Sequence, residues 1–312
     1  MNVEQFCSAS RVVIVAGKGG VGKTTVTAAL ATAAARAGAS VLIVEVEGKS
    51  GLSAALGCDP LTYEAQPVAD RLTARTLTPD EALLEYLEEH GLRRISRRLV
   101  RSGALDVVAT AVPGMKDILV LGKVKQLEQG GAADLIVIDA PAAGHAVSFL
   151  LSARGLLDAV RVGPVRTQAE EVIALLSDPA RCRVMLVTLA EETPVNELIE
   201  TAFALEDRVG VKLGPVVVNA VPDPLGFEGR AFDDAADAGL AVALPVAAAL
   251  DAAATFRAER RTLAVAQADR LAQRLPLPQL RLPFVFGEIG PRQIGELAEA
   301  LATAVGALPD PR

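Results

Sequence analysis

The chain has 312 residues, with 31 Lys and Arg against 38 Asp and Glu, and a net charge of −7. Hydrophobic residues make up 51% of it but aromatic residues only 3%, so its apolar mass is aliphatic. Single-stranded nucleic acid is bound on aromatic faces beside a basic groove, and a negative chain repels phosphate backbones and anionic lipid outside local patches. We therefore expect no nucleic-acid partner.

The mean hydropathy of +0.35 raises the question of a membrane segment. The richest apolar stretch, 26–46, is interrupted by polar residues and glycine, and we expect no transmembrane segment because a spanning helix needs about 20 mostly apolar residues. The N-terminus lacks the basic region of a secretion signal. Cys7, Cys58 and Cys182 lie far apart without zinc-ligand spacing. These features favour a cytoplasmic protein with reduced thiols and no zinc.

Strand-length apolar runs alternate with helix-length segments along the chain. The runs are rich in β-branched residues and lie at 12–16, 41–46, 135–139, 183–189 and 215–221. Their near-continuous apolar character is typical of strands that are buried on both faces of a parallel sheet. Between and after them we expect helices at Lys23–Ala37, Ala143–Leu151, Gln168–Leu176, Pro194–Val209, Ala247–Leu271 and Pro291–Leu308, with an edge strand at Leu280–Phe286. Thr193 and Pro194 fit a helix cap and first helical position.

This alternation predicts an α/β fold with a doubly wound, mostly parallel sheet, spanning residues 1–312 as one domain. The interval 59–129 has no persuasive strand pattern, and we expect a small helical insertion there. Within it, the basic run at 92–101 is either a solvated helix face or a contact for phosphate or lipid.

A glycine-rich motif, GKGGVGKTT, runs from Gly17 to Thr25 between the first predicted strand and the first long helix. It fits the G-x-x-x-x-G-K-S/T phosphate-binding loop, in which backbone N–H groups surround phosphate oxygens at the positive end of a helix dipole. Lys23 is expected to contact the β- and γ-phosphates, and the Thr24 hydroxyl to bind Mg²⁺. Thr25 can reach the α-phosphate. The remaining nucleotide-binding positions of the loop are Gly19, Gly20, Val21 and Gly22.

Lys18 is an addition that a simple phosphate loop does not need. The motif with this lysine resembles the deviant Walker A ATPases, which include partition ATPases and the arsenite-pump family. In that group the extra lysine reaches across a nucleotide-sandwich dimer to the partner's phosphates. The resemblance therefore implies a catalytic role for Lys18 like that of an arginine finger, with a solvent-facing lysine as the alternative.

Later segments resemble the arsenite-pump and tail-anchored-protein-targeting (ArsA-type) branch, and most of all bacterial proteins described as anion-transporting ATPase-like. The stretch DAPAAGH, from Asp139 to His145, is similar to the branch's second switch, and Asp139 at a strand end can hold Mg²⁺ through water. His145 is either catalytic or a residue at a helix start. By the same resemblance, Asn219, Pro283 and Phe284 are expected to contact adenine.

The first switch departs from the family pattern. Glu47 stands where the family has an Asp that orients the attacking water, and its longer side chain matters because a displacement of about 1 Å can lower a rate about 100-fold. Glu45 is a second carboxylate nearby. The zinc clip and methionine-rich client groove of the tail-anchored-protein branch are also missing.

Together these features predict a Mg²⁺-dependent ATPase that binds ATP and ADP and couples nucleotide state to a protein client. We expect it to act as a homodimer or as a heterodimer with a paralogous subunit. One alternative is a nucleotide-gated scaffold or regulatory subunit with little hydrolysis of its own. Another is a partition or division-site ATPase, which the acidic C-terminal helix disfavours as a membrane binder.

Overall fold

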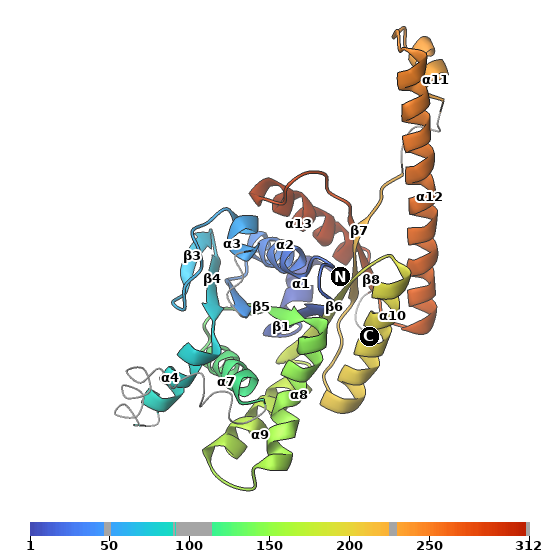
Figure 1. Ribbon diagram of the computed structural model, residues 1–312. Coiled ribbons are helices and arrows are strands. Elements are labelled where there is room, and N and C mark those ends of the chain that lie inside the picture. Colours follow the sequence, from blue (N-terminus) through green and yellow to red (C-terminus); the bar gives the residue numbers. More distant parts are fainter. Residues whose placement is uncertain (47–50, 90, 92–113, 225–229, 310–312) are drawn as a thin grey trace.

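The computed structural model describes residues 1–46, 51–89, 91, 114–224 and 230–309. At its centre lies an eight-stranded sheet in the order β3-β4-β2-β5-β1-β6-β7-β8, which Figure 1 shows between two helical layers. Neighbouring strands are parallel except β3 and β4. The strands are β1 (Val12–Gly17), β2 (Val41–Val46), β3 (Gln66–Ala69), β4 (Leu72–Leu77), β5 (Leu135–Ala142), β6 (Cys182–Leu189), β7 (Val216–Val221) and β8 (Gln279–Pro283). The predicted doubly wound α/β fold is confirmed.

Two hydrophobic cores form because the central strands are apolar on both faces. In β1, Ile14 belongs to one core and Val13 and Val15 to the other. The core of Val13 is covered by α1 (Val3–Ser8), α2 (Lys23–Arg36), α3 (Gly51–Leu56) and α13 (Pro291–Gly306). The core of Ile14 is covered by α7 (Met115–Gln129), α8 (Ala143–Ala159), α9 (Pro164–Ser177) and α10 (Glu192–Ala204).

The C-terminal third contains a helix pair that extends away from the sheet. α11 (Ala231–Asp237) packs on the far end of α12 (Leu244–Arg274), and Figure 1 shows both leaving the body of the molecule. Several large apolar side chains of this region are exposed: Phe232, Leu240, Leu244, Val246, Leu250, Phe256 and Leu263. Among the described residues, exposed apolar surface therefore gathers on this helix pair more than on the predicted insertion.

The interval 59–129 differs from the expected helical insertion. Residues 66–77 form β3 and β4, and β4 extends the main sheet by pairing with β2. The strand signal was weak because β4 contains Arg75 and Thr76, which are buried polar residues; the guanidinium of Arg75 lies over the Tyr63 ring. Helices α4 (Pro79–Glu89) and α7 follow as expected, and the basic run at 92–101 lies outside the described residues.

The remaining elements match their predicted places with small shifts. The helices predicted at Ala143–Leu151 and Gln168–Leu176 are longer, as α8 and α9, and β8 lies at a sheet edge as expected. α10 begins at Glu192 with Glu191 as its cap, so the prediction that Thr193 caps this helix is wrong. Pro194 is still tolerated because the first-turn N–H groups have no partner within the helix. A π-helix, η1 (Leu205–Val209), continues from α10.

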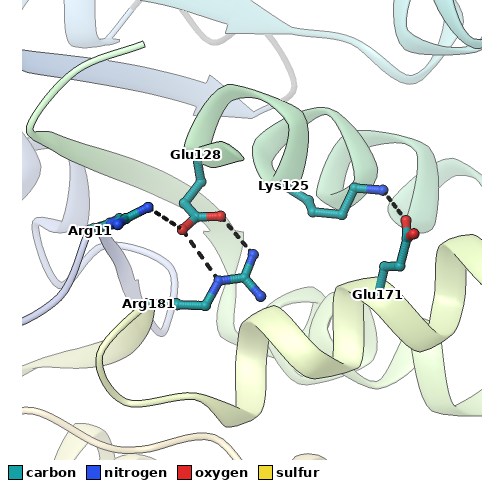
Figure 2. Close-up of polar contacts among 5 residues, drawn as sticks. All are labelled: Arg11, Lys125, Glu128, Glu171 and Arg181. Carbon is teal, nitrogen blue, oxygen red and sulfur yellow. Dashed lines mark hydrogen bonds and ion pairs between the residues drawn. The ribbon is translucent and has the colours of Figure 1, made fainter. Parts of the chain in front are cut away.

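A charged cluster lies at the amino ends of the central strands β1 and β6, and Figure 2 shows its contacts. The Glu128 side chain at the end of α7 is only 2% exposed, and it accepts hydrogen bonds from Arg181 at 3.2 and 2.6 Å and from Arg11 at 3.3 Å. The hydrogen bonds from Arg181 to Glu128 are the main reason that the pKa of the Arg181 guanidinium lies above its ordinary value. On the same helix, Lys125 pairs with Glu171 of α9. The cluster joins both helices to the strand starts.

Candidate ATP site

The glycine-rich loop joins the end of β1 to the start of α2. Gly20 and Gly22 have φ angles of 84° and 89°, in the left-handed region that side chains disfavour. Gly17 is required for a different reason, since a Cβ atom there would lie 2.4 Å from the carbonyl oxygen of Val187 in β6. The glycines therefore allow both the tight turn and the close packing of the loop on the sheet.

Lys23 is the first residue of α2, and its side chain folds back over the loop. Its Nζ donates a hydrogen bond to the carbonyl oxygen of Lys18 at 3.1 Å. The ammonium group thus lies above the turn, at the positive end of the α2 dipole. A bound phosphate would meet the lysine and the helix start together.

Thr24 and Asp139 lie together beside the loop. The Thr24 hydroxyl donates to Asp139 Oδ2 at 2.7 Å, and the Thr27 hydroxyl to Oδ1 at 3.5 Å. β5 is next to β1 in the sheet, with Asp139 paired in register with Val15 on one side and with Glu45 of β2 on the other. A hydroxyl and a carboxylate are hard oxygen ligands of the kind that Mg²⁺ binds, so the side chains present fit this ion.

Lys18 does not extend freely into solvent. Its Nζ forms an ion pair with Glu197 Oε1 of α10 at 2.5 Å, although the two side chains remain 51% and 30% exposed. Glu197 is 179 positions from Lys18 and belongs to no motif, so the sequence alone does not mark it.

Asn219 near the end of β7 binds the loop itself. Its Nδ2 donates to the carbonyl oxygen of Val21 at 3.0 Å, and a Cβ atom on Gly22 would lie 2.2 Å from it. A side chain at position 22 would therefore have to displace the Asn219 amide as well as adopt the strained φ of 89°. Pro283, also predicted at the base, is the last residue of β8 and pairs with Val221.

A cavity of about 600 Å³ opens between α12 and the carboxyl ends of β6 and β7. Phe284 lines it, and its ring meets that of Phe286 edge-on at 5.0 Å. The Arg257 guanidinium lies 5.0 Å from the Phe286 ring centre, and its Nε has no hydrogen-bond partner among the residues that the structure describes. Phe286, two residues after Phe284, was not among the predicted site residues. Neither was Arg257, which carries no sequence signal.

The structure thus brings Lys18, Lys23, Thr24 and Asp139 together at the carboxyl ends of the central strands. Asn219 binds the same loop through Val21. Thr25 follows in the first turn of α2. Glu47 lies outside the described residues, and His145 is in α8 with a side chain that is also outside them. No helix among the described residues has the length and apolar character needed to cross a membrane.

Known proteins are similar to this chain in sequence. A family model described as anion-transporting ATPase matches residues 10–163. The ATPase BagA of Mycobacterium tuberculosis is 34% identical over 95% of this chain and 93% of its own length. The ATPase get3 of Schizosaccharomyces japonicus is 30% identical over 44% of this chain and 42% of its own. The chain therefore belongs to the anion-transporting, ArsA-type ATPase family, and it is an ATPase.

Proposed function

We propose that the chain binds Mg²⁺ with ATP or ADP at the loop and hydrolyses the ATP. The observation that carries the proposal is the contact of Thr24 with Asp139 next to Lys23. Thr24 would bind the ion directly and Asp139 through water, while Lys23 and the loop N–H groups hold the phosphates. The ion would neutralise charge on the phosphate oxygens during transfer. Glu47 is our candidate for orienting the attacking water.

We place the adenine base in the cavity lined by Phe284 and Phe286. The cavity is of ligand size and mostly apolar, as sites for flat rings are, and Arg257 adds a donor on one side. Asn219 connects this region to the loop through Val21. Pro283 would fix the chain that carries Phe284 rather than line the cavity.

We also propose that the working unit contains two subunits, either a homodimer or a heterodimer with a paralogue. Its nucleotide state would control the binding of a protein client in the cytoplasm. Lys18 supports a second subunit because its side chain remains half exposed at the loop. From the partner's loop it would stabilise charge on the transferred phosphate.

Phosphate release by the purified chain tests this function. Lys23→Ala should lower turnover at least 100-fold, as removal of one preorganised donor does in other enzymes, by about 10²–10³. Lys18→Ala should lower it as well, while Lys212→Ala, at an exposed lysine outside the loop, should not. Unchanged turnover in both loop variants would contradict the proposal.

A regulatory subunit with little hydrolysis is the second candidate, and Glu47 in place of the family's Asp favours it. It predicts that the lone chain binds ATP tightly but hardly turns it over until a paralogous subunit is added. Rapid hydrolysis by the lone chain would exclude this alternative.

A further inference from the structure

The ion pair between Lys18 and Glu197 connects the phosphate loop to α10 within a single chain. The Lys18 ammonium donates to the Glu197 carboxylate at 2.5 Å, and the loop and α10 enclose a crevice of only about 10 Å³. Such a space holds about one water molecule. The lysine is therefore held against its own subunit and not extended from it.

α10 is also bonded to α12, so Glu197 has a defined position. Arg260 of α12 pairs with Glu191 at the helix cap at 2.9 Å, and Arg270 donates to Asn196 at 2.8 Å. Val195 and Leu198, on either side of Glu197 in sequence, are buried in the core. The carboxylate thus sits on a rigid helix, whereas the lysine is on a loop with glycines on both sides.

The two roles of Lys18 compete. While the Lys18 ammonium stays 2.5 Å from Glu197, this carboxylate neutralises the positive charge that the lysine would offer to phosphates in another subunit. Since both side chains are partly solvated, the ion pair can break at low cost, as exposed pairs do. It therefore opposes subunit association without preventing it.

We propose that Glu197 is a positioning residue that retains Lys18 in the single subunit and releases it when a second copy of the chain binds across ATP. This inference rests on the proposed two-subunit function and adds its regulation. Glu197 takes no part in the chemistry. It sets the subunit concentration at which Lys18 becomes available.

The test measures ATP turnover per subunit over a range of chain concentrations. The molecular mass of the protein in solution is measured in parallel, once with ATP and once with ADP, to follow subunit association. Glu197→Gln should lower the concentration for half-maximal turnover about twofold to fivefold, the range expected for an exposed ion pair, and leave turnover at saturation unchanged. Added salt should shrink the difference between wild type and variant because it screens exposed charges. Glu197→Asp, which keeps the charge, should restore most of the wild-type behaviour.

The matched control is Glu200→Gln, which removes the same charge from an exposed position three residues further along α10. It should leave the half-saturating concentration unchanged. In a Lys18→Ala background, Glu197→Gln should no longer alter ATP-dependent association measured by mass. Thermal unfolding of every variant confirms that it is folded.

The outcomes separate the inference from the function on which it rests. If the wild type associates in ATP and Lys18→Ala impairs turnover, but Glu197→Gln behaves like Glu200→Gln, the inference alone is wrong. A weaker association in Glu197→Gln also overturns it. If the wild type remains monomeric in ATP at every concentration, the homodimeric function and the inference both fail.

Discussion

The two ends of the parallel strands, called the carboxyl edge and the amino edge of the sheet, carry charged groups that differ in their exposure to solvent. At the carboxyl edge, Lys18 and Glu197 form an ion pair whose side chains are 51% and 30% exposed. At the amino edge, Glu128 is 2% exposed and held by Arg181 and Arg11 (Figure 2). Charges that water and ligands can reach are replaceable, whereas a buried charge must keep its partners. The difference separates the side chains available for chemistry from those that hold the fold.

The hydrogen bonds at the loop are also ones that a nucleotide could replace. Lys23 donates to a loop carbonyl and the Thr24 hydroxyl to the buried Asp139 carboxylate. If both groups turned to phosphate and metal, the bound ion would balance the charge of Asp139. By contrast, the bonds from Arg11 and Arg181, just before β1 and β6, neutralise the buried carboxylate of Glu128. Substitutions at the two edges should therefore change different quantities.

The largest effect on stability is expected from Arg181→Ala. It leaves the buried Glu128 carboxylate with Arg11, at 3.3 Å, as its one ion-pair partner among the described residues, and the free energy of unfolding should fall by about 3 kcal/mol, the lower end for breaking a buried pair. Urea unfolding measures this change. Arg292→Ala, which removes an exposed i,i+4 pair on α13, is the control and should change stability by less than about 1 kcal/mol. Equal losses in both variants would contradict the comparison.

The thiol of Cys182, next to Arg181, provides a second measure of the amino edge. Burial raises its pKa to about 12, so less thiolate is present near pH 8 than for an ordinary cysteine. We expect a thiol reagent to label it about 100-fold or more slowly than the half-buried Cys58, because labelling requires local opening of the strand. Mass spectrometry of labelled peptides measures both rates, and denatured chain, in which all three cysteines react, is the control. Labelling of Cys182 as fast as Cys58 would show that this edge is open.

Sequence alone predicted the carboxyl edge better than the amino edge, for a physical reason. The loop is a local motif, since glycine, lysine and threonine within nine residues fix both backbone shape and charge. The Glu128 cluster joins residues 53 and 117 positions apart, and nothing near any of them marks the contact. The same holds for Glu197. β4 was missed because Arg75 interrupts the apolar pattern, although it is buried against Tyr63.

A smaller effect, on the Mg²⁺ dependence of turnover, is expected from substitution of the proposed metal ligand Thr24. Thr24→Ala removes the hydroxyl that contacts Asp139, and the Mg²⁺ concentration for half-maximal turnover should rise about tenfold or more, as for lost groups around other metal sites. Thr24→Ser keeps the hydroxyl and should stay close to wild type. Titration of turnover with Mg²⁺ at saturating ATP measures both variants. If Ser and Ala behave alike, Thr24 does not hold the ion.

The smallest effect on stability is expected from Glu197→Gln, the variant that should alter association. Because both partners of the Lys18–Glu197 pair are partly exposed, its loss should change the free energy of unfolding by less than about 1 kcal/mol. Urea unfolding of the nucleotide-free chain, beside Arg181→Ala, gives the direct contrast between the two edges. A loss near that of Arg181→Ala would mean that Glu197 holds α10 in place. Its effect on subunit association would then follow from a damaged helix and not from a released lysine.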